Sequence, residues 1–216
     1  MEAEYTAAIR TLAAALDARD PYSTGHSDRV SVLSMAIGRQ LRLAADECEV
    51  LRLGALLHDI GKIGVPEELL CKPAPLTPLE YDTIKQHPVL GARILSAVPF
   101  PGRHLTIVEL HHERPDGRGY PYGLCGDDIP LLARIVHVAD AYDAITNARA
   151  YRSARTSGEA LRELWRCAGT DFHTDIVAAL ATALSSSPLL GRLRARTRSF
   201  DETGPRSREA VENLNI

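Results

Sequence analysis

Apolar residues recur at helical spacing along most of the chain, and the alternating pattern typical of strands is not found. The first predicted helix covers 2–19, and Asp20-Pro21 ends it because the residue before a proline is pushed out of the helical conformation. Further helices are predicted over 27–41, 46–59, 78–97 with a break at His87-Pro88, 105–110, 131–147, 158–167 and 174–184. The pattern therefore predicts an all-α fold.

Proline and glycine mark the connections between these helices. Residues 64–78 hold four prolines and predict a stiff, irregular connection, while 113–130, rich in glycine, proline and aspartate, predict a loop. Thr77-Pro78-Leu79-Glu80 matches a capping box with proline at the first helical position. Gly61 and Gly64 are expected to cap the preceding helix.

The composition changes after Ser185. Residues 1–184 carry the helical pattern and predict one domain, whereas 185–216 are polar and predict a weakly ordered or partly helical tail. Arginines alternate with other residues in this tail, at positions 192, 194, 196 and 198. A solvated tail is the favoured interpretation of this run, and binding of an anionic partner is the alternative.

The 216-residue chain carries 25 basic and 28 acidic side chains, for a formal net charge of −3. This balance argues against a protein that coats a nucleic acid duplex, which would be clearly basic. No uncharged apolar run is long enough to span a membrane, and the N-terminus lacks the pattern of a signal peptide. The four cysteines are scattered without a CxxC pair, so we expect reduced thiols in the cytoplasm.

Ionisable residues stand on the most apolar segments. His58-Asp59 and His111-His112 each end an apolar helix, and Asp140 lies inside another. Such groups are costly to bury unless they are paired or bind a metal, and imidazole and carboxylate ligands suit manganese, iron or zinc. A single buried pair could instead be a structural hydrogen bond, and isolated histidines such as His104 and His173 are more often surface or hydrogen-bonded residues. Several such groups at the ends of different helices favour metal binding.

Two further residues add chemistry beside Asp59. Gly61 would let the backbone pass close to the site, because it has no side chain. Lys62 would place an ammonium group about one turn beyond Asp59, where it could neutralise an anionic substrate. The alternative for Lys62 is a solvated surface lysine.

Several separated motifs, in order, resemble one known family. His26, HDIGK at 58–62 and Asp140 resemble the HD phosphohydrolase superfamily, and HHERPDGRGYP at 111–121 resembles its HD-GYP domains. The resemblance extends over residues 8–184 and includes RDPYSTGHSDRV at 19–30, HP at 87–88, IPLLARIVHVADAYDAIT at 129–146 and RAYR at 149–152. It implies an all-α, HD-domain helical bundle with a central binuclear metal site, and hydrolysis of cyclic di-GMP to pGpG, which family members often carry on to GMP.

The resemblance also implies the metal ligands and the catalytic residues. One metal position comprises His26, His58, Asp59 and Asp140, and the other comprises Asp59, His87, His111 and His112. The expected cofactors are two divalent ions, iron or manganese, and the lack of thiolate ligands disfavours zinc only weakly. Asp59 would bridge the two ions, which activate a water and hold phosphate oxygens, and Lys62 would stabilise the phosphate or the leaving group.

Substrate contacts are implied at Lys62, Tyr120, Arg149 and Arg152. Arg149 and Arg152 match basic positions that hold the second phosphate or a guanine, since a guanidinium can make two parallel contacts with phosphate. The Tyr120 ring would stack on a guanine or bind the phosphate.

The segment around Tyr120 has a second implied role. Gly117, Gly119 and Pro121 would shape the loop, and Glu113, Arg114 and Asp116 are expected to orient His111 and His112. In the family this loop also contacts diguanylate cyclase (GGDEF) domains, so a substrate role and a partner role both stay open. An oligomer is a further possibility.

Two features separate this chain from parts of the family. Some members carry a glutamate at the position of Tyr22 that supports a third metal, so a two-metal centre is expected here and hydrolysis onward to GMP is in doubt. A sensor domain usually precedes the family domain, whereas this chain begins in the first helix. The alternatives are a stand-alone enzyme, a regulatory output whose input domain has been lost, and an excised fragment. The alternative functions are cleavage of another cyclic dinucleotide, such as cyclic GMP-AMP, and a cyclic di-GMP receptor with little catalysis.

Overall fold

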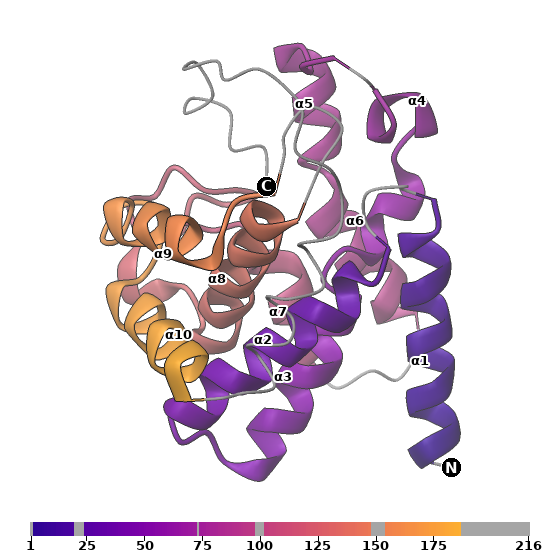
Figure 1. The fold of residues 1–216 in the computed structure, drawn as a ribbon. Coiled ribbons are helices and arrows are strands. Elements are labelled where there is room, and N and C mark those ends of the chain that lie inside the picture. Colours follow the sequence, from indigo (N-terminus) through magenta and orange to yellow (C-terminus); the bar gives the residue numbers. More distant parts are fainter. Residues whose placement is uncertain (1, 20–23, 73, 98–101, 148–153, 187–216) are drawn as a thin grey trace.

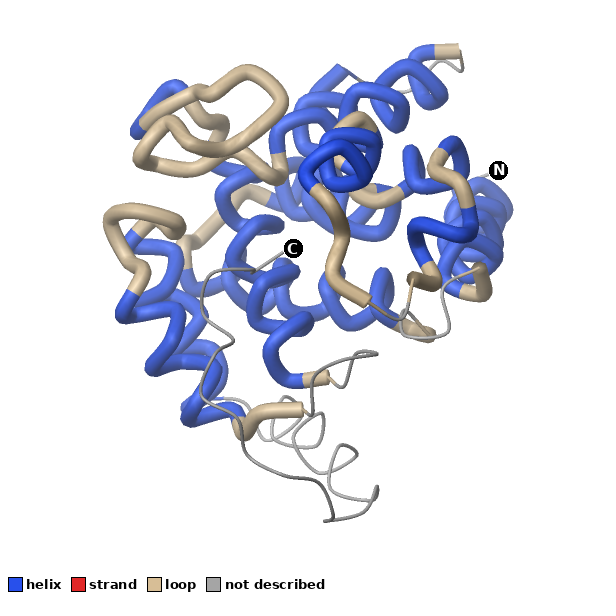
Figure 2. Tube along the Cα trace, turned by 90° about the horizontal axis from the view of Figure 1, so that it is seen from above, coloured by secondary structure: helices blue, strands red, loops and turns tan. Residues whose placement is uncertain are grey.

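Helices form the whole framework of the residues that the structure describes, and Figures 1 and 2 show helices joined by loops, without a strand. This computed structural model describes residues 2–19, 24–72, 74–97, 102–147 and 154–186. The α-helices are α1 (Glu2–Asp17), α2 (His26–Gln40), α3 (Ala45–Leu57), α4 (Glu67–Leu70), α5 (Pro78–Ile84), α6 (His87–Ser96), α7 (Gly102–Leu110), α8 (Leu131–Thr146), α9 (Ser157–Arg166) and α10 (Thr174–Ser186). Two 3-10 helices, η1 (Ile60–Gly64) and η2 (Gly126–Asp128), complete them. The predicted all-α fold is confirmed.

Local sequence signals set several helix ends as expected. The Thr77 hydroxyl accepts a hydrogen bond from the Glu80 amide at 3.3 Å, and the Glu80 carboxylate accepts one from the Thr77 amide at 2.7 Å. This capping box starts α5, with Pro78 in its first turn. The predicted break is also confirmed, because α5 ends at Ile84 and α6 begins at His87.

The segment after α3 differs from the prediction. Gly61 and Gly64 do not cap α3, because the chain continues past Leu57 into η1, which contains both glycines. The connection over 64–78 is also less irregular than expected, since it includes the single turn α4. Short 3-10 and α turns follow tertiary contacts that a pattern of glycine and proline does not reveal.

Helix α8 lies at the centre of the main apolar core because it is apolar on almost every side. Its residues from Leu132 to Ile145 are buried, with the exception of Arg134. Helices α2, α3, α9 and α10 contribute to the same core (Figure 1). A second apolar cluster joins α1, α3, η1, α6 and α7, and it includes Leu53, Leu57 and Val108. Because α3 belongs to both clusters, packing on two sides holds the residues that end it.

Gly61 stands at a close approach between η1 and α6. A Cβ atom built at Gly61 would lie 1.8 Å from the carbonyl oxygen of His87 and 2.6 Å from the amide nitrogen of Gly91. Only glycine fits there, so the expectation that Gly61 lets the backbone pass close to the site is confirmed. The contact fixes the first turn of α6 against the segment that follows Asp59.

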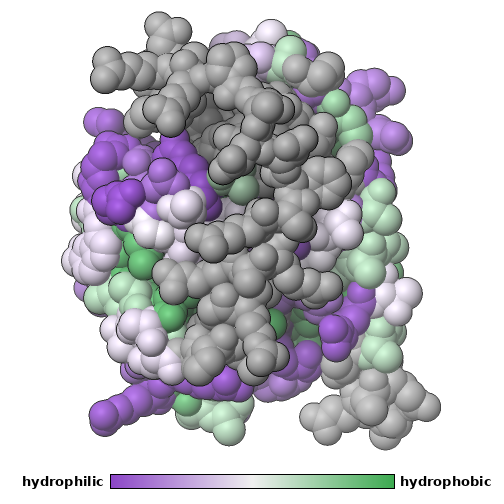
Figure 3. Space-filling model, in the orientation of Figure 1, coloured by the Kyte–Doolittle hydropathy of each residue, from purple (hydrophilic) through white to green (hydrophobic). Residues whose placement is uncertain are grey.

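Several predictions concern residues outside the described ranges. These are the tail beyond residue 186, Tyr22, and the expected substrate contacts Arg149 and Arg152. The domain boundary at residue 184 also stays a prediction. None of the described helices is long and apolar enough to cross a membrane. On the face in Figure 3, hydrophilic and hydrophobic residues are interspersed over the described surface.

Replacing Gly61 by alanine should push η1 and α6 apart, because the new methyl group would meet backbone atoms that cannot turn away. We expect the free energy of unfolding to fall by about 1–3 kcal/mol, the usual cost of overpacking, in urea denaturation followed by circular dichroism. Gly102→Ala is the matched control, since a Cβ atom there meets nothing within 4 Å. Equal stability of Gly61→Ala and the unaltered protein would contradict the close approach.

Candidate metal centre

The predicted metal ligands come from the ends of four helices and the middle of a fifth. His26 opens α2, the pair His58-Asp59 follows α3, His87 opens α6, the pair His111-His112 follows α7, and Asp140 lies within α8. All seven residues are buried, with His58 and His111 fully enclosed. Each packed helix end therefore delivers a polar side chain into the interior.

These side chains form two adjoining groups. The ligand atoms of Asp59, His87, His111 and His112 lie within 4.8 Å of one another, and so do those of His26, His58 and Asp140. His104, His137 and His173 belong to neither group among the described residues. The two groups are those that the resemblance implies, except that Asp59 falls in one of them only.

The Asp59 carboxylate nevertheless faces both groups. Its Oδ1 lies 3.2 Å from His87 Nε2, whereas its Oδ2 lies 3.6 Å from His58 Nε2 and 3.8 Å from His26 Nε2. Lys62 Nζ contacts the same Oδ2 at 2.6 Å. One oxygen is thus directed to each group, which is the arrangement that a bridging carboxylate requires.

Backbone carbonyls orient three of the imidazole rings. The Nδ1 atoms of His58, His87 and His111 lie 2.7, 2.9 and 2.8 Å from the carbonyl oxygens of Ala55, Ile84 and Val108. Each carbonyl belongs to the residue three positions earlier in the chain. In the neutral rings Nδ1 therefore carries the proton, and Nε2 is left with its lone pair directed into the group.

The Nε2 atoms of three histidines face one another at short range. His87 Nε2 lies 3.4 Å from His111 Nε2 and 3.2 Å from His112 Nε2. Where both rings of the His87–His111 pair are neutral, this contact joins two acceptors, which repel each other unless a positive charge lies between them. The observation fits a divalent cation bound among these rings.

Burial and neighbouring charges set the protonation of the groups. Burial lowers the pKa of His111 and His112 well below the usual value, and the nearby imidazoles lower it further. Burial raises the pKa of Asp59, but Lys62 and the adjacent histidines outweigh it and hold that pKa well below its usual range. Neutral imidazole and ionised carboxylate are the forms that bind a metal, so the buried His and Asp cluster indicates a divalent metal site.

One residue that orients a ligand was missed by the sequence reasoning. Asp143 Oδ2 lies 2.8 Å from His26 Nδ1, and Arg29 contacts the same carboxylate through Nε at 2.7 Å and Nη2 at 3.0 Å. Burial lowers the pKa of His26, but the bond to Asp143 and the charge of Asp140 outweigh it and raise that pKa. Asp143 stands one helical turn after Asp140 on the same apolar helix, and this spacing was the available signal.

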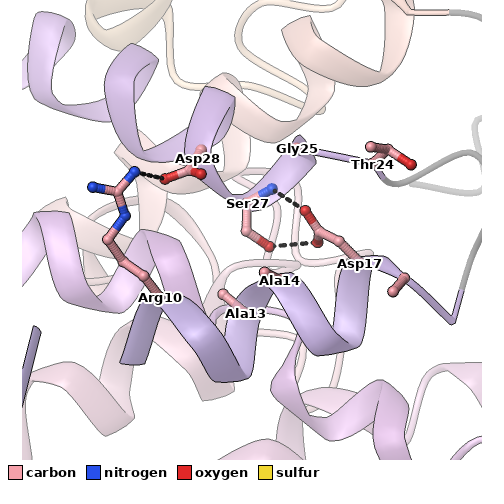
Figure 4. A pocket seen from close by; sticks show the side chains of 9 residues that line it. Arg10, Ala13, Ala14, Asp17, Thr24, Gly25, Ser27 and Asp28 are labelled. Carbon is pink, nitrogen blue, oxygen red and sulfur yellow. Dashed lines mark hydrogen bonds and ion pairs between the residues drawn. The ribbon is translucent and has the colours of Figure 1, made fainter. Parts of the chain in front are cut away.

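The start of α2, which carries His26, is also anchored from α1. Asp17 accepts hydrogen bonds from the hydroxyl of Ser27 at 2.8 Å and from its amide at 3.4 Å. Figure 4 shows these contacts beside a cavity of about 170 Å³ between the two helices. Gly25, at the N-cap position, adopts the left-handed φ of 68° that glycine tolerates best.

The loop after His112 is held by its own acidic residues rather than by the imidazoles. The buried Glu113 carboxylate accepts hydrogen bonds from the amides of Tyr122 at 2.7 Å and Leu124 at 2.9 Å. Arg114 pairs with Asp116 at 2.7 Å and with Asp171 at 2.5 Å. The expectation that Glu113, Arg114 and Asp116 orient His111 and His112 is therefore corrected. The side-chain bonds of these three residues build the loop, and the Val108 carbonyl orients His111.

Glycine and histidine complete this loop. A Cβ atom at Gly119 would lie 2.4 Å from the Arg114 amide nitrogen, and Gly117 has a φ of 73°, so both positions require glycine. The peptide bond before Pro121 is cis. His137 donates from Nδ1 to the Glu113 carbonyl oxygen at 2.8 Å, so this histidine supports the loop instead of joining the two groups.

Tyr120 lies against the site. Its ring stacks on His112 with 4.6 Å between centroids and 25° between planes, and burial raises its pKa well above the usual value. The ring of Tyr81 meets it edge to face at 6.4 Å. The stack on His112 is a contact that the sequence reasoning did not foresee, since it assigned Tyr120 to the substrate.

A sequence model described as HD domain matches residues 10–176 of the chain. The chain is 40% identical over 176 residues to the cyclic di-GMP phosphodiesterase response regulator RpfG of Xanthomonas campestris pv. campestris, covering 80% of this chain and 46% of that protein. It is 39% identical over 174 residues to 3'3'-cGAMP-specific phosphodiesterase 3 of Vibrio cholerae serotype O1, covering 80% of this chain and 38% of that protein. The chain thus spans less than half the length of these curated relatives.

A solved structure agrees with the sequence comparisons. The chain resembles Bd1817, an HDG"Y"P protein from Bdellovibrio bacteriovorus, with a TM-score of 0.63 and 28% identity. The match covers 74% of this chain and 52% of that chain. The resemblance drawn from the motifs is confirmed by these matches.

Glu113→Ala should destabilise the loop, because two backbone amides lose a charged acceptor in a buried place. We expect the free energy of unfolding to fall by about 2 kcal/mol in urea denaturation. Glu109→Ala is the matched control, since the Glu109 carboxylate accepts a bond from the exposed Tyr122 hydroxyl, at 2.5 Å, rather than from a backbone amide of the described loop. An equal loss for both variants would contradict the role of Glu113 in the loop.

Proposed function

The chain belongs to the HD domain family, and from this premise we propose that it is a metal-dependent phosphodiesterase that cleaves cyclic di-GMP. The observation that carries the proposal is the pair of adjoining ligand groups, with the Asp59 carboxylate facing both of them and the Nε2 atoms of His87 and His111 facing one another. The substrate is proposed from the relative at 40% identity, which is named a cyclic di-GMP phosphodiesterase.

The residues present fit two divalent ions, and we propose iron or manganese. His26, His58, Asp140 and Asp59 would hold one ion, and Asp59, His87, His111 and His112 would hold the other. Two such ions supply a water of lowered pKa and stabilise negative charge on phosphate oxygens. The protein contributes rings fixed by hydrogen bonds and a buried setting that strengthens each electrostatic contact.

Lys62 is proposed to stabilise the substrate phosphate or the departing ribose oxygen. Its ammonium group lies 2.6 Å from Asp59 Oδ2, and 25% of its side chain is exposed. The group is therefore next to the shared carboxylate and still open to an incoming phosphate. A positive charge in this place favours the extra negative charge that develops in the transition state.

The remaining substrate contacts stay proposals from the resemblance. Arg149 and Arg152 follow the end of α8 in the sequence and would bind the second phosphate or a guanine. Tyr120 is proposed to hold His112 in place through the stack, in addition to any contact with the substrate. Residue 22 is a tyrosine, where some family members carry the glutamate that supports a third metal. We therefore propose a two-metal centre and pGpG as the main product.

A second cyclic dinucleotide has a specific observation in its favour. The Vibrio cholerae relative named a 3'3'-cGAMP-specific phosphodiesterase is 39% identical, almost as similar as the cyclic di-GMP enzyme. Cyclic GMP-AMP is therefore the alternative substrate. A contact between the loop and GGDEF domains also stays a proposal, supported by the exposed Tyr122 and Arg118 on the outer side of the loop.

The metal-loaded protein should convert cyclic di-GMP to pGpG. The test uses protein purified without oxygen and supplied with manganese or iron, with products followed by chromatography and bound metal by elemental analysis. Asp59→Ala should lose both metal and activity, because it removes the carboxylate that faces both groups. Asp46→Ala, which alters an exposed carboxylate, is the control.

The alternatives give different results in the same assay. Faster cleavage of cyclic GMP-AMP than of cyclic di-GMP would replace the proposed substrate. Two bound metals and tight binding of cyclic di-GMP without product would indicate a receptor. Full activity of Asp59→Ala would contradict the metal-dependent mechanism itself.

Lys62→Ala should lower kcat by about 10²-fold while the bound metal stays unchanged, since it removes one stabilising charge from the transition state. Lys72→Ala is a close control, because Lys72 has the same side-chain exposure of 25% and the same 2.6 Å contact with a carboxylate, Glu80. Steady-state kinetics with cyclic di-GMP separates kcat from KM. A loss of rate shared equally by both variants would count against a specific role for Lys62.

A further inference from the structure

His26 is oriented differently from His58, His87 and His111. His58, His87 and His111 each donate from Nδ1 to a backbone carbonyl three residues earlier. His26 is the first residue of α2. Its Nδ1 instead meets a carboxylate from another helix, Asp143 of α8, at 2.8 Å.

Donors occupy the Asp143 carboxylate completely. Arg29 Nε and the Asn147 side-chain amide donate to Oδ1 at 2.7 and 2.9 Å. Arg29 Nη2 and His26 Nδ1 contact Oδ2 at 3.0 and 2.8 Å. A carboxylate has about four acceptor sites, so none is left for a substrate or a metal.

Arg29 balances the charge of this buried carboxylate. The Asp143 side chain is 3% exposed, and an isolated charge in such a place would be costly. The guanidinium contacts both oxygens of Asp143, and its Nη1 donates to the Thr24 carbonyl oxygen at 2.7 Å. Arg29 lies one turn after His26 on α2, so one helix supplies both the ring and the cation that supports its acceptor.

We propose that Asp143 and Arg29 are a positioning pair that fixes the His26 ring with Nε2 directed at His58 and Asp140, and that this makes the two metal positions unequal. The inference rests on the proposed function and deepens it. A carboxylate strengthens an imidazole as a metal ligand more than a neutral carbonyl does. The ion at His26, His58 and Asp140 therefore depends on Asp143, whereas the ion at His87, His111 and His112 does not.

Metal-binding isotherms of the full chain test the pair directly. Metal-free protein is titrated with Mn²⁺ by isothermal calorimetry, and the number of sites and each Kd are recorded. Asp143→Asn should weaken one of two sites by about 10–100-fold and leave the other unchanged. Arg29→Gln should weaken the same site to a smaller extent, and it serves as the second variant if Asp143→Asn does not fold.

A double variant separates positioning from a general structural role. If Asp143 acts through His26, Asp143→Asn should cause no further loss of Mn²⁺ affinity in a His26→Ala background. Asp28→Asn, which alters a 57% exposed carboxylate on the same helix, is the matched control and should bind Mn²⁺ normally. Equal weakening of both sites, or an additive loss in the His26→Ala background, would overturn the positioning role.

Failure of the inference differs from failure of the proposed function. If the unaltered chain binds two Mn²⁺ ions and both Asp143→Asn and Arg29→Gln bind them as tightly, only the positioning pair is overturned. If the unaltered chain binds no Mn²⁺, the metal-dependent mechanism and the inference that rests on it are both overturned.

Discussion

The rest of this structure depends on one constraint, the close contact between imidazole nitrogens beside the Asp59 carboxylate. His87 and His111 each use Nδ1 to bond a carbonyl, and their Nε2 atoms then face one another at 3.4 Å. Buried polar groups need partners, and two acceptors cannot partner each other. A cation shared by these side chains would resolve this conflict, and it would explain why five helices bring polar side chains to one place.

The packing of the helices around the centre places the metal-ligand candidates close enough to share a cation. Apolar packing on both sides of α3 fixes the position of Asp59, and the glycine at position 61 brings α6 close enough for His87 to reach it. The loop after His112 is held by Glu113, and Tyr120 returns from that loop to stack on His112. Stability and ligand placement therefore depend on the same contacts, so a change in one is expected to affect the other.

Sequence reasoning could predict what depends on local pattern and on recognisable motifs. Apolar periodicity predicted the helices, and the Thr77 capping box and the break at His87 followed from local chemistry. The motifs pointed to the seven residues that meet in the structure. The contact of Gly61 with His87 and the bond between His26 and Asp143 join residues distant in the chain. Local pattern singles out Gly61 and offers a signal for Asp143, but it does not identify the residue that either one contacts. Glu113 was assigned to the imidazoles because it adjoins them in sequence, although its carboxylate turns to the loop.

The most direct measurement is a crystal structure of the manganese-loaded protein with anomalous diffraction data collected at the manganese absorption edge. Two anomalous peaks are expected, one on each side of Asp59, with His26, His58 and Asp140 around the first and His87, His111 and His112 around the second. A single peak away from Asp59, or none among these residues, would contradict a binuclear centre built on that carboxylate.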